Sequence, residues 1–140
     1  MVGVRGESSK HATVVGADPT GLGRWNHTDM INNDIKVRVM SACQRVKSKQ
    51  TLGTVHLQRR RCFRARDIHE CPRKLFILHL PQLVFDSISS GLEVILTVDV
   101  NEHVAKGKLA QQLNALGLRE AYCTKFNSEG GPAQCFRCRH

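Results

Sequence analysis

The sequence predicts an α/β fold, and three segments are the basis for this prediction. Residues 35–43 alternate between apolar and polar side chains, which is typical of a half-buried strand. Residues 92–100 follow Gly91 as a nearly continuous apolar run, which indicates a strand buried on both faces. Between them, residues 72–89 carry apolar side chains three and four positions apart, which predicts a helix.

The first part of the chain shows no sustained hydrophobic period. We expect residues 1–17 to be poorly ordered and a domain to extend over residues 18–140. Glycines and a proline mark a loop around Arg24 and Trp25. Trp25 is interpreted as a packing residue, with stacking on a nucleic-acid base as the alternative.

Two further segments are predicted to contain helices, and the 72–89 helix has two prolines. Residues 52–66 are interpreted as a short basic helix. In the 72–89 helix, Pro72 suits the first turn, but Pro81 falls in the interior, where proline costs about 3 kcal/mol. Either this helix kinks at Pro81 or two shorter helices meet there. A last helix is expected over 103–116, with Gly117 at its C-terminal cap.

The positive charge of the chain is concentrated in one segment. The formal net charge is +9, yet Ile35 to Arg66 contains ten Lys or Arg residues and no Asp or Glu. Such a one-sided distribution favours contact with a polyanion, and nucleic acid is the partner we expect. The alternative is a solvated face or one that meets an acidic neighbour. The candidate phosphate contacts are Arg59, Arg60, Arg61, Arg64 and Arg66.

Neither a membrane segment nor a secretory signal is recognisable, so we expect an intracellular protein whose six cysteines are thiols. Cys135 and Cys138, with two residues between them, suggest a zinc site completed by Cys123 and His140. The alternative is that these cysteines are reduced and bind no metal.

Asp99 and Asn101 follow the apolar run at its C-terminal end. Residues two apart in a strand share a face, so both side chains point to the same side. A carboxylate and an amide placed in this way are able to hold a water molecule and a phosphate oxygen. The alternative is that they turn the chain and cap the following helix.

Several segments, taken in their order along the chain, resemble a known group of enzymes. They resemble the endonuclease/exonuclease/phosphatase (DNase I-like) superfamily, particularly its divergent members in retrotransposon-type proteins. The segments that carry the resemblance are Asp18–Trp25, Lys36–Ala42, Cys71–Lys74, Asp99–Glu102 and Leu116–Ala121.

The resemblance implies a Mg²⁺-dependent phosphodiesterase built as a four-layer α/β/β/α sandwich, present here as a partial domain. It gives Asp99 the role of positioning the attacking water, and Asn101 a hydrogen bond to the scissile phosphate. This matches the electrostatic and metal-assisted chemistry of phosphoryl transfer.

The chain also departs from the family pattern. The expected upstream metal-binding glutamate has no match, Cys43 stands where a tyrosine is usual, and Val98 replaces a glycine. The final Asp-His segment of the family would lie beyond His140. We therefore expect an inactive or weakly active fragment with unassigned metal ligands and uncovered sheet edges, marginally stable or prone to associate. The alternatives are a non-catalytic nucleic-acid-binding module and a decayed mobile-element copy without a present function.

Overall fold

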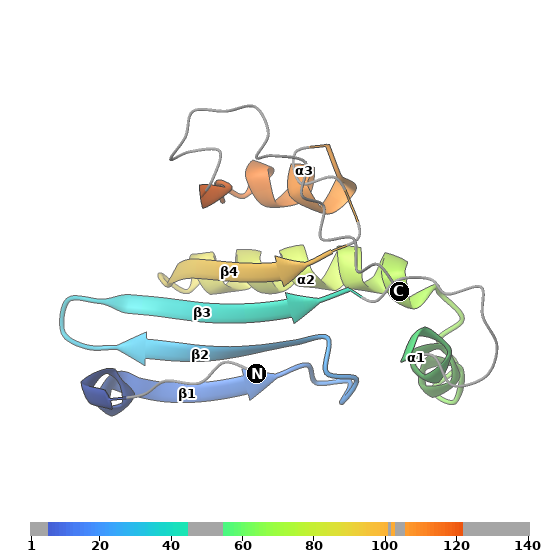
Figure 1. Ribbon diagram of the computed structural model, residues 1–140, viewed down its shortest axis with the longest axis horizontal. Coiled ribbons are helices and arrows are strands. Elements are labelled where there is room, and N and C mark those ends of the chain that lie inside the picture. Colours follow the sequence, from blue (N-terminus) through green and yellow to red (C-terminus); the bar gives the residue numbers. More distant parts are fainter. Residues whose placement is uncertain (1–5, 45–54, 101, 103–105, 122–140) are drawn as a thin grey trace. The chain divides into compact units, whose positions relative to one another are not determined.

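The computed structural model is mixed α/β and describes residues 6–44, 55–100, 102 and 106–121 (Figure 1). The chain divides into two compact units, Met1–Asn101 and Glu102–His140. Among the described residues, the first unit contains a sheet and two α-helices, and the second contains one α-helix.

The first unit is built on a four-stranded sheet with the order β1-β2-β3-β4. The strands are β1 (Ala12–Ala17), β2 (Trp25–Ile31), β3 (Lys36–Cys43) and β4 (Glu93–Asp99), and the 3₁₀ helix η1 (Gly6–His11) precedes them. The first three strands are successively antiparallel, and β4 pairs with β3 in parallel. The strands β1, β3 and β4 therefore run in the same direction and end at the same side of the sheet (Figure 1).

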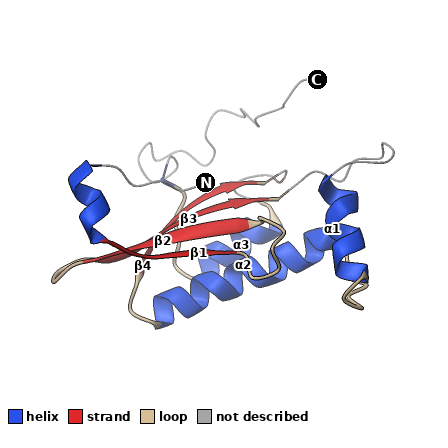
Figure 2. Cartoon of the chain, turned by 90° about the horizontal axis from the view of Figure 1, so that it is seen from below, coloured by secondary structure: helices blue, strands red, loops and turns tan. Residues whose placement is uncertain are grey.

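A parallel pair requires a crossover connection, and the described part of the connection from β3 to β4 contains two helices. These are α1 (Val55–Arg64) and α2 (Pro72–Ser89), and α2 lies along one face of the sheet (Figure 2). The rings of Trp25 on β2 and Phe76 on α2 pack with centroids 6.2 Å apart. The buried apolar side chains of this unit are Trp25, Met40, Ala42, Phe63, Leu75, Phe76, Leu80 and Val84.

The predicted strand at 35–43 and the predicted basic helix within 52–66 are confirmed as β3 and α1. The helix predicted over 72–89 is also confirmed. It continues through Pro81, so the alternative of two shorter helices is wrong. Leu80 and Val84, on either side of Pro81, are fully buried, and this packing offsets the cost of the proline.

The N-terminal part is more ordered than expected, because residues 12–17 form β1 and residues 25–31 form β2. The expectation of a poorly ordered segment is wrong for β1. Strand β2 was not predicted from the sequence, because most of its side chains are polar and show no apolar alternation. Thr28 and Asp29 are nevertheless buried, and Arg38 on β3 binds the Asp29 carboxylate with both Nε (2.6 Å) and Nη2 (2.7 Å).

The strand predicted over 92–100 is confirmed as β4, but its predicted burial on both faces is wrong. Exposed and half-buried residues alternate along it, and Ile95 is 55% exposed. Among the strands that the structure describes, β4 pairs with β3 alone and lies at the edge of the sheet. An apolar run therefore does not guarantee a central strand.

The second unit contains α3 (Lys108–Ala115), which is shorter than the predicted 103–116 helix. Residues 103–105 lie outside the described part. Gly117 has a φ of +86°, and its N–H donates to the Asn114 carbonyl at 2.9 Å, which confirms the predicted C-terminal cap. Within the described residues, no helix combines the length and hydrophobicity that a membrane span needs.

Candidate functional site at the ends of beta3 and beta4

The parallel pairing of β3 with β4 brings Cys43 and Asp99 together at the carboxyl ends of the two strands. They are register partners, and the thiol of Cys43 donates to Oδ2 of Asp99 at 3.7 Å. The backbone N–H of Gln44 donates to the Asp99 carbonyl at 2.8 Å and extends the pairing by one bond. The strand ends are thus fixed, while the Asp99 side chain is exposed.

An exposed carboxylate at a strand end is able to orient a water molecule or to ligate a cation. Asn101, the predicted partner of Asp99, lies outside the described residues. Among the residues that are described, no three His, Cys, Asp or Glu side chains gather in a way that would hold a metal ion. The metal ligands of the expected Mg²⁺ therefore stay unassigned within the described residues.

A second carboxylate, Asp18, lies directly after β1 and is fully engaged. Nε and Nη2 of Arg24 donate to its two oxygens at 2.7 and 3.0 Å, and the Thr20 hydroxyl donates to Oδ1 at 2.7 Å. Both side chains of the ion pair are buried. Burial alone would raise the pKa of Asp18, but the hydrogen bonds from Arg24 and Thr20 outweigh it and lower the pKa to about 2.

Arg24 itself is enclosed by aromatic rings and a histidine. Its guanidinium carbon lies 4.1 Å from the ring centroid of Trp25 and 5.5 Å from that of Phe63. Nη1 lies 3.2 Å from Nδ1 of His79, and because arginine only donates, Nδ1 is the acceptor. Trp25 is 6% exposed, so it is a packing residue and is not available to stack on a base. The sequence pattern did not reveal this buried cluster.

Helix α1 has two different faces. His56, Arg59 and Phe63, spaced three and four apart, are buried. Nη2 of Arg59 donates to the carbonyls of Leu22 (3.1 Å) and Gly23 (3.4 Å), which fixes α1 to the loop that contains the Asp18–Arg24 pair. Arg59 was predicted to contact phosphate, and the structure shows it engaged with this loop.

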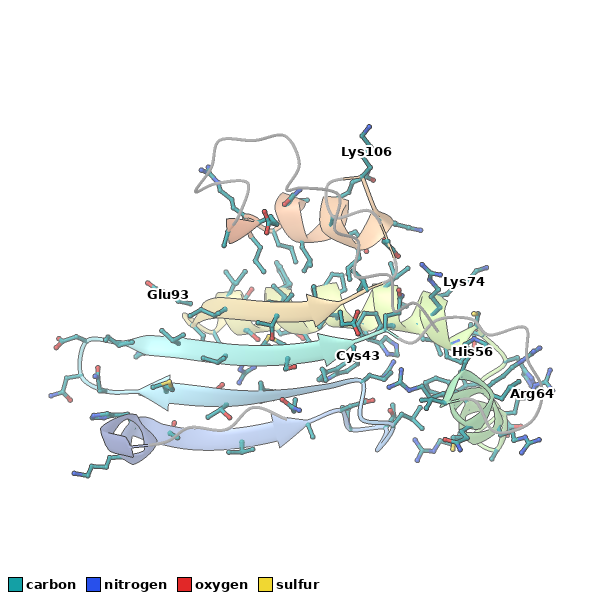
Figure 3. The ribbon with its side chains drawn as sticks, in the orientation of Figure 1. Cys43, His56, Arg64, Lys74, Glu93 and Lys106 are labelled. Atoms are coloured by element: carbon teal, nitrogen blue, oxygen red, sulfur yellow. The ribbon has the colours of Figure 1, made fainter. Side chains whose placement is uncertain are left out.

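The other predicted arginines are exposed. Arg60, Arg61 and Arg64 share the outer face of α1, which we call the outer arginine face. Figure 3 shows Arg64 pointing away from the sheet, while His56 lies on the side of α1 nearer to Cys43. Arg66 follows the helix, and its Nη1 donates to the Thr20 carbonyl at 3.0 Å.

The zinc ligands suggested by the sequence, Cys123, Cys135, Cys138 and His140, lie outside the described residues. No family model, no curated protein and no solved structure matches the chain.

Proposed function

We propose that the chain is a phosphodiesterase-type domain that acts on nucleic acid at the carboxyl ends of β3 and β4, with weak turnover by itself. In this proposal the fold is a partial four-layer α/β/β/α sandwich, to which the described sheet and α2 contribute two layers. Mg²⁺ is the ion expected from the resemblance to DNase I-like enzymes.

One observation carries the proposal. The resemblance independently relates two distant segments of the sequence to active-site positions, the tyrosine position at Cys43 and the aspartate position at Asp99. In the structure these two residues are register partners on neighbouring strands. Two segments matched by chance would have no reason to end side by side with their side chains in hydrogen-bond contact.

The weak turnover follows from the residue at position 43. A thiol is shorter than a phenol, so Cys43 does not reach as far from the strand as a tyrosine would. Its hydrogen bond also engages the carboxylate that the proposed chemistry needs. General acid–base steps require such groups within about 3 Å of the reacting atoms.

The test is the nicking of supercoiled plasmid in Mg²⁺ by the full chain. We expect slow nicking by the wild type, a loss of about tenfold or more in Asp99→Ala, and faster nicking in Cys43→Tyr. Asp34→Ala is the matched control, because Asp34 is an exposed carboxylate in the β2–β3 turn, at the other end of β3. Equal nicking by the wild type and Asp99→Ala would show that the assignment of Asp99 is wrong.

The outer arginine face supports a second candidate, a nucleic-acid-binding module without catalysis. Arg60, Arg61 and Arg64 are exposed, and α1 contains no acidic residue that could neutralise them. Contacts of this kind are independent of base sequence and weaken steeply with salt. Binding that persists in Asp99→Ala, with no nicking by any variant, would favour this candidate.

A further inference from the structure

A small pocket lies where β3 ends and the two helices of the first unit begin. It is lined by Gln44, His56, Arg59, Pro72, Arg73 and Phe76. Its enclosed volume is about 10 Å³, which is room for one atom of the size of a water oxygen. A larger ligand could therefore insert a single atom while the rest of it stays outside.

The polar lining of the pocket is cationic or neutral. Two guanidinium groups, from Arg59 and Arg73, and the imidazole of His56 meet there, and no carboxylate is among the lining residues that the structure describes. Gln44, His56 and Arg59 are 2%, 8% and 7% exposed, so water screens this positive potential poorly. A pocket of this composition favours an anion.

The start of α2 strengthens this preference. Its first turn contains Arg73, which lines the pocket, and no acidic residue, and Cys71 at the N-cap makes no capping hydrogen bond with its side chain. Positive side chains next to the positive end of a helix dipole are unfavourable unless an anion lies nearby. An anion at this helix end would therefore be stabilised by the helix dipole as well as by the positive charge of Arg73.

Hydrogen bonds hold two of the side chains that line the pocket. The side-chain amide of Gln44 donates to the Arg73 carbonyl at 3.4 Å, which ties the end of β3 to the start of α2. Arg59 is held by the carbonyls of the 18–24 loop at 3.1 and 3.4 Å. The side chains of Gln44 and Arg59 are therefore positioned before any ligand arrives, which reduces the entropy cost of binding.

We propose that this pocket binds one oxygen of a phosphate group and so anchors a phosphate beside Asp99. Gln44 directly follows Cys43, and its N–H bonds to the Asp99 carbonyl, so the pocket begins where the Cys43–Asp99 pair ends. The identification of the phosphate as part of a nucleic acid rests on the proposed function. The anion site itself depends only on the geometry of the pocket.

The experiment measures the binding of inorganic phosphate to the full chain by calorimetry, without Mg²⁺, for the wild type, Arg73→Gln and Lys74→Gln. Arg73 lines the pocket, whereas Lys74 is its exposed neighbour in the same helical turn and does not line it. We expect Arg73→Gln to raise the Kd about tenfold, and Lys74→Gln to raise it less than about twofold. Arg73→Lys keeps the charge but loses the forked donor, so its Kd should fall between those of the wild type and Arg73→Gln.

Absent phosphate binding in the wild type, or equal losses in Arg73→Gln and Lys74→Gln, would overturn the proposal. Circular dichroism checks the fold of each variant, and Arg73→Lys provides the decisive comparison if Arg73→Gln does not fold. A second series uses one oligonucleotide with and without a 5′-phosphate, which separates a nucleic-acid phosphate from the free ion. If the pocket binds phosphate through Arg73 but no plasmid is nicked, the proposed function fails and the anion site stands.

Discussion

Two carboxylates at the same end of the sheet have opposite surroundings. Asp18 follows β1 and Asp99 ends β4, and both strands run in the same direction. Asp18 is buried and accepts hydrogen bonds from Thr20 and Arg24, whereas Asp99 is exposed and accepts one from the Cys43 thiol. A carboxylate at a strand end is therefore not a functional group by position alone.

The two carboxylates also differ in how their negative charges are stabilised. Arg24 is buried with Asp18, so neither charge is stabilised by water, and each depends on the other. Asp99 keeps its hydration, which leaves it able to exchange a water molecule for a ligand. The region around Asp18 is thus specialised for stability, whereas the proposed chemistry belongs to the region around Asp99.

The largest expected effect comes from exchanging each carboxylate for its amide. Asp18→Asn leaves the buried Arg24 cation without its counter-charge and should lower the free energy of unfolding by about 3–5 kcal/mol. Asp99→Asn, at an exposed site, should change it by less than about 0.5 kcal/mol. Urea denaturation followed by circular dichroism measures both. Similar losses in the two variants would contradict the comparison.

Lowering the pH should reveal the contribution of Asp18 to stability without a mutation. The pKa of Asp18 is about 2 in the folded protein against an ordinary 3.8, so the unfolded chain takes up its proton first as the pH falls. The stability from this pair is complete above about pH 4 and is lost between about pH 4 and pH 2, with a size of about 2 kcal/mol. The unfolding free energy of Asp18→Asn should lack this component. Parallel pH curves for the two proteins would show that Asp18 is not the group responsible.

Arginines on the two faces of α1 extend the comparison from carboxylates to cations. Arg59→Met removes donors from the carbonyls of Leu22 and Gly23 and should cost about 1–3 kcal/mol of stability. Arg61→Met should leave stability within about 0.5 kcal/mol.

The same pair of variants separates stability from binding. Arg61→Met should reduce the dependence of log K on log salt by about 0.9 for duplex DNA, because one phosphate contact is lost. Fluorescence anisotropy over a salt series gives this slope. A salt slope in Arg61→Met equal to that of the wild type would exclude Arg61 from the binding surface.

Local periodicity was sufficient to predict a large part of the fold. The strand β3, the helix α2 and the Gly117 cap are set by alternation, by three-and-four spacing and by a left-handed glycine, which are all readable within a few residues. The strands β1 and β2 were missed because long-range contacts bury the polar residues of β2. Arg38 bridges Asp29 on β2 and Ser87 on α2, and no local pattern in β2 indicates such a bridge.

The candidate site was predicted only in part, because it too depends on contacts between distant segments of the chain. The placement of Asp99 at a strand end followed from the apolar run before it. The position of Cys43 beside Asp99 could not be predicted, because the register of β3 against β4 depends on how the α1–α2 connection packs. The turn formed by Asp18 and Thr20 is local, but the contact of Arg24 with His79 joins residues far apart in the sequence. The sequence thus located Asp99 at a strand end but did not indicate that Asp18 is paired with the buried Arg24.

The smallest expected effect concerns His79, which borders the buried pair. Burial lowers the pKa of His79 from its ordinary 6.5, the positive charge of Arg24 lowers it further, and Asp18 opposes them. Because the unfolded chain then binds the proton more readily, stability should fall as the pH drops below about 6.5. His79→Gln should reduce this slope between pH 7.5 and pH 5.5 in urea titrations. Some slope should persist, because burial also lowers the pKa of His27. An unchanged slope would mean that His79 accepts a proton without disturbing Arg24, and that the buried pair tolerates a second cation at its edge.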